Sequence, residues 1–176
     1  MSVYIIDFLE SICIMWLYWF VLDPLFHEFG HAIMLRKTEG YAAISFYVPI
    51  AKKFKINIGG IEVFNVRNKK YKNITYSKSD FIEIEDADNV KIARAGIRNS
   101  VILTIIILVF SILVRLAILL LLMIVMLVLF IYARFFDKKY NDFNIAKNPQ
   151  SFKQRNNQYD IDSCMKYDNL IKEYNK

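Results

Sequence analysis

The stretch "DPLFHEFGHAIMLRK", residues 23–37, contains both histidines of the chain in largely apolar surroundings. In a helix, residues four apart lie on one face, so His27 and His31 point the same way. Glu28 lies about 100° around the helix from His27. Two histidines at this spacing bind one zinc ion, while the glutamate between them reaches the water on that ion, which is the chemistry of the HExxH motif. The stretch therefore predicts a helix that carries a metal site.

The apolar content of the chain argues against an ordinary soluble domain. Its 176 residues are 56% hydrophobic, with a mean hydropathy of +0.28, and suffice for one domain at most. Residues 12–35 and 97–136 are apolar enough to cross a bilayer, whose hydrocarbon core takes about 20 residues of helix. The first stretch is no cleaved signal peptide, because it lacks a basic start and an Ala-x-Ala site and contains the histidines. We expect a single polytopic membrane domain, residues 1–176.

Basic residues predict how the chain is oriented. Arg36 and Lys37 follow the first apolar stretch, and Arg134 marks the end of the last one. The positive-inside rule therefore places the C-terminal end of each stretch in the cytoplasm. An even number of crossings must separate them, and residues 97–136 should form a helical hairpin that turns near residues 111–115. The alternative is one helix of about 60 Å, twice the hydrocarbon thickness. We expect an α-helical membrane protein with about three transmembrane helices, in the plasma membrane of a prokaryote, with its site toward the cytoplasm.

The segment between the membrane stretches, residues 38–92, differs from them in character. It carries half of the lysines, and "FKINIGGIEVFNV" alternates apolar residues on both sides of Gly59 and Gly60, which predicts a β-hairpin. We therefore divide the domain into the HExxH helix, a small cytoplasmic β-rich insert, the transmembrane hairpin and a polar cytoplasmic tail. These span residues 1–37, 38–92, 93–136 and 137–176.

The cysteines and the net charge limit the kinds of site and partner that the chain can have. Cys13 and Cys164 are far apart and in no CxxC pair, so neither a disulfide framework nor a cysteine zinc site is expected. The net charge of +6 is explained by the positive-inside rule and by attraction to anionic headgroups, and we expect no nucleic-acid partner.

Gly30 and Ala32 keep the helix surface small, so that another backbone can approach closely. A non-catalytic membrane accessory protein remains possible, but a structural site has no use for Glu28.

Two motifs resemble those of a known family. "HEFGHAIM" resembles the HExGHA signature of the site-2 proteases, the intramembrane zinc metalloproteases of the M50 family. "AGIRNS", residues 95–100, is similar to that family's Ala-Gly-Pro-x-x-Asn element, with Ile97 in place of the proline. A β-structured segment commonly separates the two elements in the family, and residues 41–84 look like one.

The resemblance implies a role for each matching residue. His27 and His31 would be ligands of Zn²⁺, and Glu28 would be the general base. Asn99 would lie near the active site and hydrogen-bond the substrate backbone, with helix packing or capping as its alternative role. The substrate would be a transmembrane segment or a hydrophobic peptide within the lipid bilayer, and the edge of the β-hairpin could bind it by strand addition.

The third ligand of the family is an aspartate in an Asp-Gly element, and this sequence has no Asp-Gly pair. In the hairpin arrangement the chain returns to the cytoplasmic edge just after Phe136, close to the depth of the histidines. Asp137 and Asp142 are therefore the candidates, and "YNDFNIAKNP" resembles a shortened form of the family element without the glycine. We predict Asp142, with Asp160 in reserve.

Two other zinc protease classes fit less well. A metzincin needs a third histidine, which the chain lacks. A membrane endopeptidase of the CaaX-processing type takes a glutamate from a downstream helix as its third ligand. The nearest candidates, Glu62, Glu83 and Glu85, lie in strand-like or acidic stretches, so this class remains an alternative.

Overall fold

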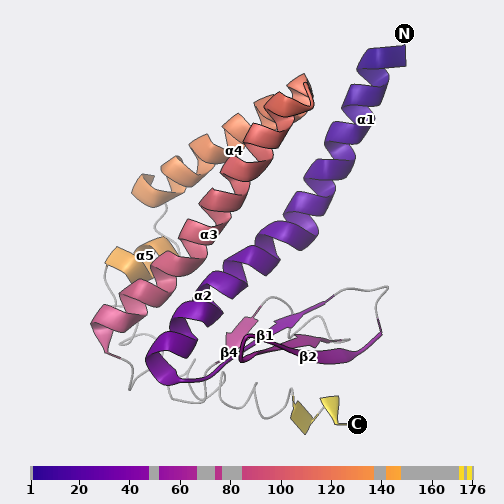
Figure 1. The fold of residues 1–176 in the computed structure, drawn as a ribbon. Coiled ribbons are helices and arrows are strands. Elements are labelled where there is room, and N and C mark those ends of the chain that lie inside the picture. Colours follow the sequence, from indigo (N-terminus) through magenta and orange to yellow (C-terminus); the bar gives the residue numbers. More distant parts are fainter. Residues whose placement is uncertain are drawn as a thin grey trace.

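The fold consists of a long helical rod, a helical hairpin beside it, and a small sheet against one end of the rod (Figure 1). The computed structural model describes residues 2–47, 52–66, 74–76, 85–136, 142–147, 171–172 and 174–175. The helices are α1 (Ser2–Leu17), a π-helical segment η1 (Tyr18–Leu22), α2 (Asp23–Glu39), α3 (Asp86–Leu113), α4 (Ala117–Phe136) and α5 (Asp142–Lys147).

The rod of α1, η1 and α2 continues through a proline. Pro24 has no N–H for the carbonyl of Phe20, and its ring crowds that carbonyl, so the helix widens into the π-turn of η1 just before it. The backbone N–H of Asp23 donates instead to the carbonyl of Tyr18. The rod ends at Gly40, which takes φ 73° and donates its N–H to the carbonyl of Arg36 at 2.9 Å.

The turn of the helical hairpin lies where the sequence predicts it. Arg115 adopts a positive φ of 58°. Its N–H donates to the carbonyl of Ile112 at 3.2 Å, and that of Leu116 donates to Ser111 at 3.0 Å. This pair of bonds is a Schellman motif, which ends a helix without requiring glycine or proline. Helix α4 then folds back along α3, so the alternative of one unbroken helix over residues 97–136 is wrong (Figure 1).

The predicted β-hairpin is confirmed. Strands β2 (Phe54–Ile58) and β3 (Ile61–Asn65) pair antiparallel around Gly59 and Gly60, whose φ values of 57° and 83° suit a two-residue turn of type I′. The hairpin belongs to a larger sheet of order β2-β3-β1-β4. Strand β1 (Ala42–Phe46) pairs parallel to β3, and β4 (Ile74–Tyr76) pairs antiparallel to β1.

The sheet and the helices share an apolar core. One face of β1 and β3 packs against α2, through Ala32 and Leu35. Helix α3 begins at Asp86, earlier than the expected boundary at residue 93. Asp86 and Asp88 explain this start, because acidic side chains in the first turn stabilise a helix N-terminus. The short helix α5 lies against α3.

Two helical stretches are long and apolar enough to cross a membrane, Ile5–Glu39 and Asp86–Leu113. The first extends beyond the expected residues 12–35 at both ends. Helix α4 is apolar over a shorter length, Ala117–Tyr132. Two of the three expected spans therefore have the required length among the described residues.

Candidate metal centre

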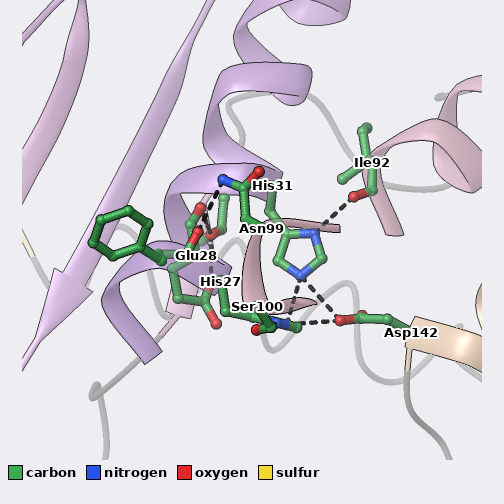
Figure 2. Close-up of polar contacts among 9 residues, drawn as sticks. His27, Glu28, His31, Ile92, Asn99, Ser100 and Asp142 are labelled. Carbon is green, nitrogen blue, oxygen red and sulfur yellow. Dashed lines mark hydrogen bonds and ion pairs between the residues drawn. The ribbon is translucent and has the colours of Figure 1, made fainter. Parts of the chain in front are cut away.

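Three potential ligand atoms meet between α2 and α5. His27 and His31 lie one turn apart on α2, and their Nε2 atoms are 3.0 Å from each other. The Oδ2 atom of Asp142, at the start of α5, lies 2.7 Å from His27 Nε2 and 3.1 Å from His31 Nε2. Figure 2 shows the three side chains converging on one point. The structure thus brings Asp142 to the two histidines, across 111 residues of sequence from His31.

Partners on α3 orient both imidazole rings. Nδ1 of His31 lies 2.8 Å from the backbone carbonyl of Ile92, which only accepts, so this nitrogen carries the proton. Nδ1 of His27 lies 3.1 Å from Oγ of Ser100, and the hydroxyl accepts when Nδ1 is protonated. In the neutral form of each ring, Nε2 is then left with a lone pair that points at Asp142. Second hydrogen bonds of this kind are typical of metal-binding histidines.

The converging atoms fit a cation. With both imidazoles neutral, the two Nε2 lone pairs and the carboxylate oxygen are all acceptors, and acceptors held 2.7 to 3.1 Å apart are stabilised by a positive charge among them. Ligand atoms of a tetrahedral zinc ion with bonds of about 2.0 Å lie about 3.3 Å apart, close to this spacing. Two histidines and one aspartate would leave the fourth position open, as catalytic zinc sites require.

Asp142 lies in a strongly polar setting. Burial by itself would raise the pKa of its carboxyl, but when the imidazoles of His27 and His31 are protonated, their hydrogen bonds and charges outweigh burial and hold the pKa below its usual range. The carboxylate form is therefore favoured at neutral pH. This is the form that binds a metal ion.

Glu28 lines the same cavity as the three ligand candidates. The cavity has a volume of about 280 Å³, and Leu35, Ile74 and Ile145 give it apolar walls. The hydroxyl of Thr75, on β4, donates to the carboxylate of Glu28 and also lies 3.2 Å from its backbone carbonyl. A strand from the β-rich insert thus holds the carboxylate at the edge of the site.

Two glycines allow α2 and α3 to approach closely at this point. A Cβ atom on Gly30 would lie 2.4 Å from the carbonyl oxygen of Ala95, and one on Gly96 would lie 2.4 Å from the His31 ring. Both contacts are too short for a Cβ atom, so a larger residue would force the Ala95 backbone or the His31 ring to shift. The prediction that Gly30 lets another backbone come near is confirmed.

Among the described residues, the other candidates are not part of the His27, His31 and Asp142 group. The amide of Asn99 donates to the backbone carbonyl of Phe26 at 3.1 Å, which matches the helix-packing role considered for it (Figure 2). Glu62 accepts from Tyr41 and pairs with Lys55, away from the histidines. Asp137, Asp160 and Glu83 lie outside the described residues.

Sequence reasoning missed three contributors to the site, namely Thr75, Ser100 and the carbonyl of Ile92. Ser100 directly follows Asn99 in the "AGIRNS" motif, so the motif could have predicted that Ser100 lies near the site. No local pattern marks Thr75 or Ile92, because their roles depend on how β4 and α3 pack against α2.

No known protein family, curated protein or solved structure matches the chain.

Proposed function

We propose that the chain is an intramembrane zinc metalloprotease that hydrolyses peptide bonds in membrane-embedded segments or hydrophobic peptides. One observation carries the proposal: the Nε2 atoms of His27 and His31 and Oδ2 of Asp142 converge within hydrogen-bonding distance of one another, beside the carboxylate of Glu28. A site that only held an ion would not need a carboxylate placed in the same cavity.

The exposed surface of the helices supports a membrane location. Only 11% of the most apolar window of Ile5–Glu39 and 33% of that of Asp86–Leu113 is buried, which is unlike the core helices of a soluble protein. Large apolar side chains cover the outer faces, with Phe20 65%, Ile106 55% and Leu121 62% exposed. Apolar surface this extensive marks contact with a membrane or with another protein, and its position on helices long enough to span supports lipid. We propose that α4 crosses as well, and that Arg36 and Lys37 place the site near the cytoplasmic face.

The residues of the site have complementary tasks. His27, His31 and Asp142 would hold the ion, with their imidazole rings oriented by Ser100 and Ile92. A bound zinc ion supplies a Lewis acid that polarises a carbonyl and makes water acidic enough to lose a proton near neutral pH. Glu28 accepts that proton and returns it to the leaving amine. Thr75 holds the carboxylate of Glu28 in place for both transfers.

The cavity favours an extended apolar substrate. Its walls from Leu35, Ile74 and Ile92 suit an apolar side chain, and β4 runs along one side of it. A transmembrane helix must unwind before a peptide bond reaches the histidines, and an unwound backbone in hydrocarbon needs protein partners for its polar groups. The polar side chains of the site supply such surroundings.

Zinc content and cleavage, measured on the same purified samples, test the proposal. We expect about one zinc ion per chain in the wild type and in Glu28→Gln, and loss of zinc in His31→Ala and Asp142→Asn. Glu28→Gln should retain zinc and lose cleavage of a reconstituted transmembrane substrate. Ser111→Ala, which changes a buried hydroxyl of α3 away from the site, serves as the folding control.

Two results would contradict the proposal. A wild-type chain without zinc, purified free of chelators, would leave the histidines with a packing role. Full cleavage by Glu28→Gln would remove the general base and with it the hydrolytic mechanism.

A further inference from the structure

A second cavity lies apart from the metal centre, where the last turns of α2 pass the tip of the β2–β3 hairpin. This groove has a volume of about 530 Å³. Phe29, Ile33 and Ile58 form its apolar walls, and Arg36 and Lys37 are its charged residues. None of the described residues that line it is acidic, so this described lining combines apolar surface with positive charge.

The order of these residues along α2 matches the orientation of a lipid. Phe29 precedes Arg36 by about two turns, or about 10 Å along the axis. If α2 ends at the cytoplasmic face, Phe29 and Ile33 lie at the depth of acyl chains and Arg36 and Lys37 lie at the depth of headgroups. A ligand in the groove would meet apolar walls on the bilayer side and cations at the surface.

The cations are placed to bind an anion. The guanidinium of Arg36 donates to the carbonyl of Gly59, which fixes it across the hairpin tip and, within the described part of the chain, leaves its other N–H groups for a ligand. A Cβ atom on Gly60 would lie 2.4 Å from this guanidinium, so glycine provides the room. Lys37 is exposed and makes no hydrogen bond or ion pair with the described part of the chain. Arginine recognises phosphate through paired hydrogen bonds, and lysine acts as a point charge.

Strand β2 extends the apolar surface beside the groove. Phe54, Ile56 and Ile58 alternate along the strand and share the face that turns toward α2, yet they are 37%, 44% and 47% exposed. A row of exposed apolar side chains on an edge strand is unfavourable in water and invites association. Contact with acyl chains would cover it.

We infer that this groove binds one anionic phospholipid of the cytoplasmic leaflet. Arg36 and Lys37 hold its phosphate, and Phe29, Ile33 and Ile58 contact its acyl chains. The inference rests on the membrane location in the proposed function and is independent of zinc and of proteolysis. The bound lipid would seat the β-hairpin against the membrane, next to the helix that carries the histidines.

Native mass spectrometry of the detergent-purified chain tests the lipid site. The probes are palmitoyl-oleoyl phosphatidylglycerol and the matching phosphatidylcholine. We expect tighter binding of phosphatidylglycerol to the wild type, and a loss of about tenfold or more in Arg36→Gln/Lys37→Gln, since one cation contributes about fivefold. The control Arg94→Gln/Lys172→Gln removes the same charge at exposed positions outside the groove and should change binding less than twofold.

Two further variants distinguish a loss of lipid contacts from a disturbed fold. Lys37→Gln alone should also weaken binding of phosphatidylglycerol. This variant removes no contact within the described chain and keeps the Arg36 bond, so a disturbed fold cannot explain the loss. Ile33→Asn should weaken binding of both lipids, and glycerophosphoglycerol, which has no acyl chains, should fail to displace the lipid. Equal binding of the two lipids, an equal loss in the control, or displacement by the headgroup alone would overturn the inference.

Zinc content read on the same samples separates the two proposals. His31→Ala should bind phosphatidylglycerol as the wild type does. Lipid selectivity lost in the groove variants but retained in His31→Ala upholds the lipid site even if the protease proposal fails. Unchanged lipid binding in Arg36→Gln/Lys37→Gln, with zinc intact, overturns the lipid site alone.

Discussion

Gly96 on α3 lies directly against the imidazole of His31 on α2, where an added Cβ atom would stand 2.4 Å from the ring. The ring fits between this glycine and Asp142, with its Nδ1 held by the carbonyl of Ile92. The position of a candidate metal ligand therefore depends on the absence of a side chain on the neighbouring helix. This relation links helix packing to the chemistry of the site.

Gly96→Ala should disturb the site without removing any ligand. The added methyl group must push the His31 ring or part the two helices, so we expect zinc content to fall below half of the wild-type value. Gly59→Asn is the control, because nothing lies within 4 Å of a Cβ there and asparagine tolerates a positive φ. Elemental analysis of both purified variants checks the prediction, and full zinc in Gly96→Ala would refute it.

Ser100→Ala should weaken zinc binding through the orientation of His27. Removing the hydroxyl leaves Nδ1 of His27 without its partner on α3, and such changes reduce metal affinity by about tenfold or more. Competition with a chelator of known affinity measures the effect. Ser111→Ala is the matched control, since Ser111 is buried on the same helix and donates to the carbonyl of Ile107. Equal affinities in the two variants would show that Ser100 does not position the ligand.

Thr75→Val should separate catalysis from metal binding. Valine keeps the shape of the side chain but removes the donor that holds the Glu28 carboxylate. We expect zinc content to stay at the wild-type value while kcat falls by about tenfold, since a mispositioned general base loses part of a contribution of about 10²- to 10⁴-fold. Steady-state cleavage kinetics check this, and a fall in zinc content would instead assign Thr75 to the structure of the metal centre.

Asn99→Ala should lower stability more than substrate affinity. The amide joins α3 to the backbone of α2 at Phe26, and loss of one such hydrogen bond lowers the free energy of unfolding by about 1 kcal/mol. Thermal unfolding in detergent and KM for a peptide substrate distinguish the two roles. A raised KM with unchanged stability would favour the substrate contact that the family resemblance implies.

The hairpin of α3 and α4 should place Arg115 on the side of the membrane opposite to Lys172. Cys13 and Cys164 would first be replaced by serine, and single cysteines introduced at Arg115 and at Lys172. In intact cells or sealed vesicles, an impermeant thiol reagent should label the first from outside and the second only after permeabilisation. Labelling of both from the same side would exclude the proposed crossing of α4.

Local features of the sequence determined much of the fold. The His27–His31 spacing indicates one helix face, Gly59 and Gly60 mark the hairpin turn, and the length of the apolar run over residues 97–136 requires a break that the structure places at Arg115. Each of these features depends on the helical repeat, on the turn preference of glycine or on the length of an apolar run. All three are properties of residues that are neighbours in sequence. The start of α3 at Asp86 was missed although its acidic first turn was present, because an acidic run also suits a loop.

Tertiary structure decided the rest of the site. The tail holds several aspartates, and only the packing of α5 against α3 brings Asp142 to the histidines, 111 residues from His31. The parallel pairing of β1 with β3 and the approach of Thr75 to Glu28 likewise join segments that no local period relates. Such contacts arise when apolar faces are buried together, and side-chain volume governs them, as Gly30 and Gly96 show. The sequence by itself determined the kinds of residue present and their local conformation, and the folded chain decided which of them meet.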